Sequence, residues 1–394
     1  MSKKWVTVIP GGNEVIPTIN ELKKLGYKVA CIDQNPNAIA FSHCDLSIIS
    51  PLTDFEKILY LLKSEDVSPE CFIPIVSDKA ILPAYMLNML FNKGKKNDHI
   101  LAFYSKSVLR NTLHKNKLPT PKYSILTEKK QLSKIDVGSK IILKPDDSSG
   151  SRGISILETI SKNKLEEAFD HAIANSSNKK VIIEEYISGE EFMIDCFIHA
   201  HKVKALLVSQ KKKIQDKVSY LIYTLNKEEF PYKKLNTFIE KLTKVMDYQQ
   251  GPLHIEVKHK DGIFYILDLA ARGGGFGVYN YYVHKALNFN FVKATIDVFL
   301  NKKLSQKNTK YREGLIYFLT PSKKGVIDSI TSAYTVKKNE DVRIDYYYKK
   351  GQQVTTDVND GNRLAGIYCF ADTKKELNEL FEKVKKSITI KYSK

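Results

Sequence analysis

The sequence has 394 residues, a hydrophobic content of 43% and a formal net charge of +18. A chain of this length can form two or three domains with buried cores. No segment approaches the roughly 18 to 20 consecutive apolar residues that span a membrane. The first residues also pass directly into a strand pattern, so we expect neither a membrane partner nor a signal peptide.

The positive charge raises the question of a nucleic-acid partner. Of the 62 basic residues only six are arginines, although arginine is the side chain that forks onto phosphates and base edges. The lysines are spread along most of the chain, as on a solvated surface. We therefore expect no nucleic-acid partner, and we expect the densest run, QKKKIQDK at 210–217, to be a mobile loop near an anionic ligand.

The five cysteines are scattered without C-x-x-C spacing, and their surroundings are apolar. An odd number of such cysteines fits reduced thiols. The sequence therefore predicts a cytoplasmic protein. The cysteines are Cys31, Cys44, Cys71, Cys196 and Cys369.

The first hundred residues alternate between strand and helix patterns. Strands are expected at 5–9, 28–32, 71–76 and 100–104, with helices at 14–25, 54–64 and 79–92. Such alternation predicts a Rossmann-like parallel sheet covered by helices. Gly11, Gly12 and Asp33 could belong to a dinucleotide site, but the full G-x-G-x-x-G pattern is absent, so a structural turn is preferred.

Beyond residue 105 the pattern becomes α+β, and we expect a multidomain chain in four parts. They are an α/β domain at 1–104, a small subdomain at 105–188, a large catalytic subdomain at 189–309 and a β-rich segment at 310–394 that completes the catalytic domain. No internal repeat or low-complexity linker separates them.

The segment ILKPDDSSGSRGISIL, at 142–157, combines a strand end with a loop of small residues. Small residues let backbone N–H groups approach an anion, and the flanking Lys144 offers a point charge to phosphate. The alternative is an ordinary flexible hairpin, which would need neither Lys144 nor Arg152. The sequence therefore favours a loop that covers phosphate, with Ser149, Gly150, Ser151, Arg152 and Gly153 at its centre.

The segment VIIEEYISGEEF, at 181–192, is a strand that ends in charged residues, Glu184 and Glu185. The backbone around Tyr186 and Ile187 would then be free to bond a planar base. Glu191, seven residues after Glu184, could accept hydrogen bonds from ribose hydroxyls. Glutamates at a strand end are common, so it is their order after the glycine loop that makes them informative.

A hairpin, GPLHIEVKHKDGIFYILDLAARGGG, carries the last group of polar residues. We expect a three-residue loop, Lys260 to Gly262, which would put Glu256 and Asp268 on one face as diagonal neighbours. Converging carboxylates repel unless a cation separates them, which points to Mg²⁺ beside a phosphate. A two-residue loop would place them on opposite faces, and Asp268 could instead simply pair with Arg272 or His254.

In this order the residues resemble the ATP-grasp family, and the resemblance covers most of the chain. SKSVLRNTLHKNKLPTP resembles its S-D-K-x-x-x-R-x-x-L segment, with Ser105 at the aspartate position and Lys106 at the phosphate-binding lysine. The N-terminal part resembles the pre-ATP-grasp domain of that family. The fold implied is that domain followed by a two-subdomain ATP-grasp fold.

The resemblance also assigns roles to the remaining residues. Lys106, Lys144, the 149–153 loop, Glu184, Glu185, Tyr186, Ile187 and Glu191 would bind ATP; Glu256 and Asp268 would hold Mg²⁺, with Mn²⁺ as an alternative; Arg272 would act in catalysis with them; His254, Arg272, Gly273 and Gly274 would bind substrate. One departure concerns the metal: the common E-x-N-x-R ending is here D-L-A-A-R, with Ala270 in place of the asparagine. Because the asparagine of that pattern also helps to hold metal, its absence argues against a second metal site.

The implied activity is that of a carboxylate-amine ligase acting on an amino acid or another small acid through an acyl phosphate, similar to L-amino-acid ligases. Small carboxylates and amines would be its substrates, selected by residues 273–285 and a loop at 209–225, and a homodimer is one assembly to expect. The alternatives are a bicarbonate-using carboxylase or carbamoyl-phosphate-type enzyme, and an ATP-binding regulator without catalysis.

Overall fold

The computed structural model describes residues 4–135, 140–148, 150–306, 310–337, 341–356 and 360–393. Among them, no helix is long and apolar enough to cross a membrane. The arrangement is a mixed α/β one, with one parallel sheet and several antiparallel sheets.

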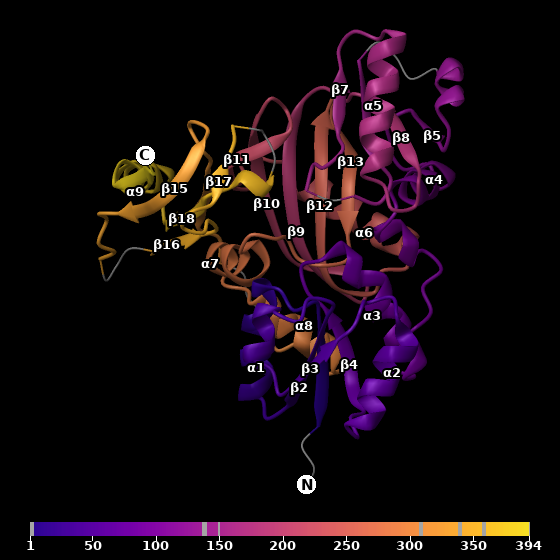
Figure 1. Ribbon diagram of the computed structural model, residues 1–394, viewed down its shortest axis with the longest axis vertical. Coiled ribbons are helices and arrows are strands. Elements are labelled where there is room, and N and C mark those ends of the chain that lie inside the picture. Colours follow the sequence, from indigo (N-terminus) through magenta and orange to yellow (C-terminus); the bar gives the residue numbers. More distant parts are fainter. Residues whose placement is uncertain are drawn as a thin grey trace.

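The N-terminal part, indigo in Figure 1, is a parallel sheet in the order β3-β2-β1-β4. Its strands are β1 Trp5–Ile9, β2 Lys28–Asp33, β3 Leu46–Ile49 and β4 Pro69–Pro74, and its helices are α1 Ile16–Lys24, α2 Phe55–Ser64 and α3 Asp78–Leu90. The predicted Rossmann-like alternation is confirmed. Asp33 accepts a hydrogen bond from the Gly11 N–H at 2.8 Å, so these residues close a turn, as preferred from the sequence.

Two details of this part differ from the expectation. Residues 100–103 form a 3-10 helix rather than a strand, and β3 was not predicted. A short apolar run does not by itself distinguish a strand from a buried helical turn, because both hide the same side chains.

A four-stranded antiparallel sheet follows, in the order β5-β8-β6-β7. Its elements are α4 Lys106–Lys115, β5 Tyr123–Leu126, β6 Ile141–Pro145, β7 Ser155–Leu157, α5 Lys162–Ala174 and β8 Val181–Glu185. Helix α5 packs its apolar side on this sheet through Phe169 and Ala172. This small layer forms the upper right of Figure 1.

The largest layer is an eight-stranded sheet in the order β13-β12-β9-β10-β11-β14-β18-β16. Its strands are β9 Glu190–His199, β10 Lys202–Ile214, β11 Val218–Leu225, β12 Gln250–Lys260, β13 Ile263–Ala270, β14 Glu313–Leu319, β16 Asp341–Tyr346 and β18 Ala365–Ala371. Helices α6 Tyr232–Val245, α7 Val283–Leu287 and α8 Phe291–Phe299 contact it, and α8 also contacts α1 and β4 of the N-terminal part. The sheet is therefore joined to the N-terminal part by packing.

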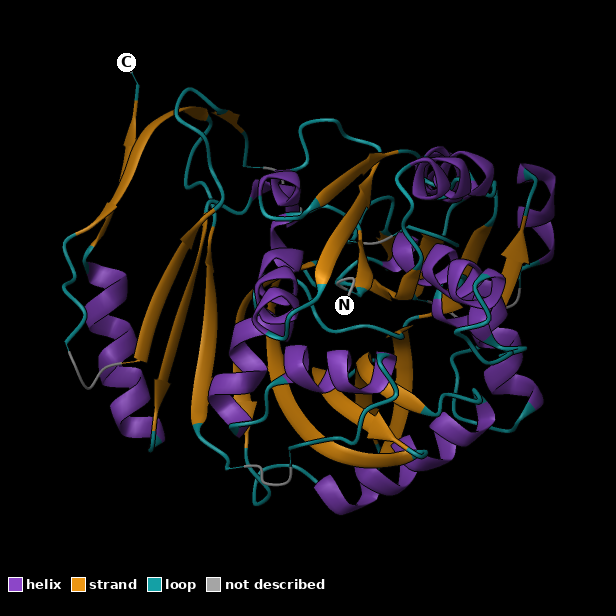
Figure 2. Cartoon of the chain, turned by 90° about the horizontal axis from the view of Figure 1, so that it is seen from below, coloured by secondary structure: helices purple, strands orange, loops and turns teal. Residues whose placement is uncertain are grey.

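The C-terminal strands β14, β18 and β16 belong to this same sheet, so the last part of the chain extends the large layer. Helix α9 Lys374–Lys386 lies along β14 and β18, beside the C-terminal strands in Figure 2. A separate three-stranded sheet contains β15 Gly325–Ser332, β17 Gln353–Val354 and β19 Ile388–Tyr392. The four-part division of the chain stays a prediction.

The register of the β12–β13 hairpin differs from the predicted one. Lys260 pairs with Ile263, so the loop has two residues, Asp261 and Gly262, both with positive φ. These dihedrals are those of the tight turns that suit the twist of a hairpin. A two-residue loop alone would have separated the carboxylates, but a bulge at Leu267 shifts the register by one residue and restores them to one face.

The lysine run at 210–217 is not a loop for most of its length. Residues up to Ile214 continue β10, which pairs with β9 and β11. Along a strand alternate side chains share a face, so Lys211 and Lys213 point together while Lys212 is exposed. The prediction of a loop was wrong because pairing with the neighbouring strands keeps residues 210–214 in β10, which the run of lysines does not indicate.

Candidate active site

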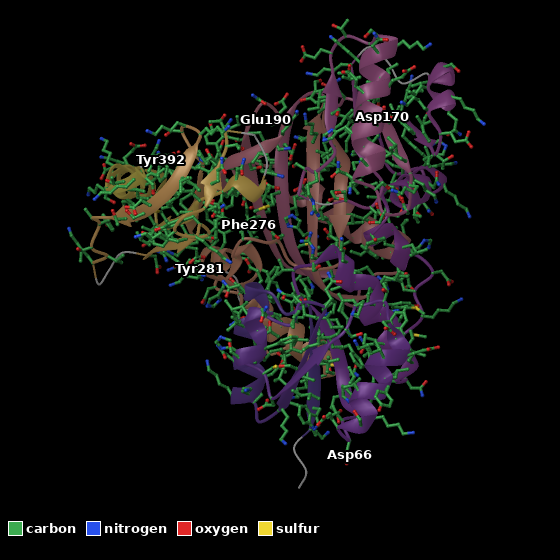
Figure 3. All side chains as sticks on the ribbon, in the orientation of Figure 1. Asp66, Asp170, Glu190, Phe276, Tyr281 and Tyr392 are labelled. Carbon is green, nitrogen blue, oxygen red and sulfur yellow. The ribbon has the colours of Figure 1, made fainter. Side chains whose placement is uncertain are left out.

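A cavity of about 550 Å³ lies where the layers meet. It is lined by Asp78 from α3, Lys144 from β6, Glu256 from β12 and Arg363 from just before β18, so the N-terminal part, the small layer and the large sheet all contribute. Phe276, which also lines it, is labelled near the middle of the molecule in Figure 3. The cavity is thus built from segments far apart in the chain.

Most of the residues singled out from the sequence line this one cavity. They are Lys106, Lys144, Gly150, Ser151, Arg152, Glu184, Glu185, Tyr186, Ile187, Glu191, His254, Glu256, Asp268 and Arg272. Ser149 lies outside the described residues. The order of the other residues along the chain predicted that they would lie together, and in the structure they line the same cavity.

Three predicted glycines do not line the cavity, and each is explained by close packing. A Cβ on Gly273 would lie 2.2 Å from Tyr279, and one on Gly274 would lie 2.8 Å from Val278. Gly153 has a φ of +74° and would bring a Cβ to 2.6 Å from Pro145. These glycines allow the chain to pass closely under its neighbours, and Gly275 and Phe276 line the cavity instead of Gly273 and Gly274.

Glu256 and Asp268 are paired directly across β12 and β13. Asp268 lies 3.8 Å from the Lys106 ammonium, and Glu256 lies 2.7 Å from that of Lys211. Arg272 is bound elsewhere, to Asp78. The simple pairing of Asp268 with Arg272 is therefore not the arrangement in the structure, and both carboxylates face cations of the cavity.

His254 is bound through Nδ1 to Asp195 at 2.8 Å, while its Nε2 lies 3.9 Å from Glu256. Burial alone would lower the pKa of His254, but the charge and hydrogen bond of Asp195 raise it to about 9. Burial would likewise raise the pKa of Glu256, and the Lys211 ammonium together with His254 holds it well below the usual range. At neutral pH the site thus presents a carboxylate beside an imidazolium.

Two lysines face the loop expected to cover phosphate. Lys106 opens α4, and its ammonium donates to the Ser148 carbonyl at 2.9 Å. Ser105, at the aspartate position of the family pattern, caps the same helix and donates to Asp146 at 2.7 Å. Lys144 lies 2.7 Å from Glu184. Both ammonium groups are held in place by contacts on their own side of the cavity.

The hinge differs from the expectation in two contacts. The Tyr186 N–H, expected to be free, donates to the Lys140 carbonyl at 2.9 Å. The Glu184 carboxylate is buried and bound by Arg110 and Lys144, so it acts on a bound nucleotide only through those two cations. Glu191 contacts Lys211 and Lys213, at 2.9 and 2.7 Å.

The N-terminal part supplies an acid that the sequence did not single out. The Asp78 carboxylate accepts a hydrogen bond from Nε of Arg272 at 2.7 Å, and Nη2 lies at the same distance. The remaining nitrogen of the guanidinium, Nη1, donates to the Gly273 carbonyl at 2.8 Å. Asp78 follows β4 of the parallel sheet, and the carboxyl ends of parallel strands are where ligands gather, so this position was a signal that could have been used.

Arg110 entered the sequence analysis only as the arginine of the S-D-K-x-x-x-R-x-x-L pattern, without a role of its own. Other residues that the sequence did not single out are Asp195, Lys258, Asp360 and Arg363. Their signals are weak, because a buried ion pair such as that of Asp195 with His254, across 59 positions, leaves no local pattern. Lys211 and Lys213 stand in a run of three lysines without alternation, so only the strand pairing shows that they share a face. The segments at 273–285 and 209–225 do contribute to the lining, the second as two strands.

The donor set suits a magnesium ion that is held jointly with phosphate. Among the described residues, no three His, Cys, Asp or Glu side chains gather as a metal cluster. Ala270 lies opposite His254 and is buried, so that position offers no side-chain oxygen to a metal. Two opposed carboxylates nevertheless fit Mg²⁺, which proteins commonly hold by one or two carboxylates while phosphate and water complete the octahedron.

Comparison with known proteins agrees with this geometry. Residues 137–279 match a family model described as an ATP-grasp domain. This segment of the chain matches the ATP-grasp domain. The matched segment contains the glycine loop, the hinge and the Glu256–Asp268 hairpin, and the rest of the chain lies outside it.

The curated relatives include a formate-dependent phosphoribosylglycinamide formyltransferase of Prochlorococcus marinus (strain MIT 9301), 29% identical over 193 residues, which are 48% of either chain. They also include dapdiamide A synthase of Enterobacter agglomerans, 23% identical over 55% of either chain. The chain thus spans about half the length of these relatives. The similarity supports a common domain.

Solved structures show the same fold over the whole chain. An L-amino acid ligase from Bacillus licheniformis superposes with a TM-score of 0.81 at 18% identity, covering 100% of this chain and 99% of that one. A phosphoribosylglycinamide synthetase from Anaerococcus prevotii gives a TM-score of 0.76 at 15% identity, with both chains covered completely. The predicted fold class is therefore confirmed.

Proposed function

We propose that the chain is an ATP-dependent carboxylate-amine ligase that forms an amide through an acyl phosphate. The observation that carries this proposal is the placement of Glu256 and Asp268 on one face, opposite Lys106 and within the cavity that also contains Arg272. The names of the similar proteins, which include an L-amino acid ligase and dapdiamide A synthase, support the class of reaction.

In this proposal the nucleotide lies along the small sheet. The base contacts the hinge at Tyr186 and Ile187, and the phosphates lie between Lys106, Lys144 and the glycine loop. Glu256 and Asp268 would hold Mg²⁺, and a bound Mg²⁺ would supply positive charge beside the phosphate oxygens. The lysines add point charges where negative charge develops.

The first step joins a substrate carboxylate oxygen to the γ-phosphorus while the bond to ADP breaks. The amine nitrogen then attacks the acyl carbon, inorganic phosphate leaves with the bonding electrons, and the nitrogen loses a proton. Arg272 is held by Asp78 so that its charge is fixed near the reacting carboxylate. His254, held through Nδ1 by Asp195 at 2.8 Å, lines the same cavity.

An acyl phosphate hydrolyses unless water is excluded. The glycine loop is close to two other segments: Ser151 donates to the Lys217 carbonyl at 3.3 Å, and a Cβ on Gly150 would lie 3.6 Å from Asp360. The glycine loop, the β10–β11 turn at Lys217 and the segment at Asp360 would together close the cavity over the nucleotide. The closed cavity would also select the substrates.

The test measures ADP and phosphate release with panels of small carboxylic acids and amines, in the presence of Mg²⁺. Release that requires one acid and one amine, with an amide as product, supports the proposal. Release that requires bicarbonate would establish a carboxylase-type or carbamoyl-phosphate-type reaction instead. Tight ATP binding without turnover for any acid would establish a regulator, and either result overturns the proposal.

The acid and the amine themselves are left to that panel. A cytoplasmic location and a homodimer stay predictions. The five cysteines are all free thiols, which supports a reducing compartment. Light scattering of the purified protein measures its assembly.

A further inference from the structure

Arg110 is the largest side chain that is completely buried among the described residues, and it does not line the cavity. It lies on α4, four residues after Lys106. A buried guanidinium is costly unless its charge and its N–H groups are satisfied. Its contacts therefore show what this position is needed for.

One side of Arg110 contacts the phosphate-facing lysine indirectly. Its Nε donates to Glu184 at 2.6 Å, and the second oxygen of Glu184 lies 2.7 Å from the ammonium of Lys144. One acid between two bases leaves a net charge of +1. Lys144 is thus oriented by a fixed carboxylate while the group as a whole still attracts an anion.

The other side of Arg110 contacts the metal-facing hairpin. Its Nη2, which also donates to Glu184 at 3.2 Å, donates to the Leu267 carbonyl at 3.0 Å. Leu267 is the residue that the β12–β13 register skips, and this bulge puts Asp268 opposite Glu256. Without this bulge, the Asp268 side chain would point to the other face of the sheet, because side chains alternate along a strand. Arg110 therefore binds the feature on which the carboxylate pair depends.

We propose that Arg110 is a positioning residue that couples the phosphate lysine Lys144 to the metal carboxylate Asp268, acting through Glu184 and through the Leu267 bulge. This inference rests on the proposed function, since it assumes a nucleotide and a metal in the cavity. The guanidinium is required because its separate nitrogens reach two partners at once, whereas an ammonium is a single point charge. Arg110 itself touches neither ligand.

The test measures binding of a non-hydrolysable ATP analogue by calorimetry, with and without Mg²⁺. Arg110→Lys keeps a charge beside Glu184 but loses the contact to Leu267. We expect metal-free affinity close to that of the wild type and a magnesium-dependent gain that is about tenfold smaller, the usual size for a residue that orients a metal ligand. Arg343→Lys is the matched control, because Arg343 binds Asp345 and does not line the cavity.

A double-mutant cycle with Asp268→Asn separates positioning from general damage. If Arg110 acts through Asp268, Arg110→Lys causes no further loss of the magnesium-dependent gain in the Asp268→Asn background. Additive losses, equal losses with and without metal, or an unchanged gain overturn the inference. If Arg110→Lys does not fold, Arg110→Gln combined with Glu184→Gln keeps the net charge of +1 and is expected to lose the gain likewise; a full gain in that double variant overturns the inference.

Failure of the proposed function is distinguishable from failure of this inference. A wild-type protein without any magnesium-dependent gain overturns both. A wild-type gain that Arg110→Lys retains overturns the inference alone. A wild-type gain without turnover in any substrate panel overturns the ligase reaction and leaves the role of Arg110 supported or rejected by the same binding data.

Discussion

Glu256 and Asp268 face each other across β12 and β13 because Leu267 is a bulge. The two-residue turn that closes the hairpin would by itself have separated them. One extra residue in β13 therefore decides whether the hairpin can hold a metal with phosphate. The spacing of twelve residues between Glu256 and Asp268 therefore places the two carboxylates on one face only in this register.

Asp268→Asn should lower magnesium-dependent turnover by about 100-fold, because an amide is a weaker ligand for Mg²⁺ than a carboxylate. Binding of ATP without metal should change little. The assay is ADP release as a function of Mg²⁺ concentration. Asp261→Asn, at the turn of the same hairpin, is the matched control, since asparagine tolerates the positive φ of that position. Equal effects of the two substitutions would contradict the assignment.

Lys211→Met should destabilise the protein by about 1–3 kcal/mol, because the buried Glu191 then keeps only Lys213 and the partly exposed Glu256 loses its nearest cation. Urea unfolding measures the free energy. Mg²⁺ with ATP should recover part of the loss. Lys212→Met is the control, since Lys212 is exposed on the opposite face of β10. If both variants are equally stable, the ion pairs at Lys211 do not contribute as proposed.

Glu184 should contribute stability that depends on pH. Burial alone would raise the pKa of Glu184, but the charges of Arg110 and Lys144 outweigh it and lower the pKa from 4.5 to about 2. A lowered pKa means that the contribution is complete above about 4.5 and is lost as pH falls toward 2. The difference in unfolding free energy between wild type and Glu184→Gln should therefore shrink over that range. A constant difference would count against the buried charge.

Asp78→Asn should lower turnover by about 10–100-fold, because Arg272 loses the carboxylate that orients it. The effect should fall on kcat and on the KM of the acid, while affinity for ATP is kept. Asp98→Asn is the control, since Asp98 is an exposed acid of the same part of the chain that pairs with Lys96. Loss of ATP affinity in Asp78→Asn would place Asp78 in the nucleotide site instead.

Gly273→Ala should destabilise the protein by about 1–3 kcal/mol or more, because a Cβ would lie 2.2 Å from Tyr279. Gly12→Ala should be nearly neutral, since nothing lies within 4 Å of a Cβ there and φ is −72°. Thermal unfolding of both variants provides the comparison. A stable Gly273→Ala variant with impaired substrate binding would restore the role expected from the sequence.

Much of the fold follows from local pattern. The alternation of apolar strands with helices in the first hundred residues determines a parallel sheet, because each strand needs helices on its faces. The order of Lys106, Lys144, the glycine loop and the hairpin likewise indicated a nucleotide site, and these residues do share one cavity. What sequence alone determined is thus which segments exist and which chemistry they carry.

The tertiary structure decided which of these groups meet and which partners they take. The bulge at Leu267, the contact of Asp78 with Arg272 and the lysines of β10 all depend on chain segments that are distant in sequence. A register shift of one residue moves every side chain of a strand to the other face. A buried charge must find a partner because its desolvation is costly, and that partner can come from a segment far away in the sequence. Neither leaves a local pattern, so both became visible only when the layers were packed together.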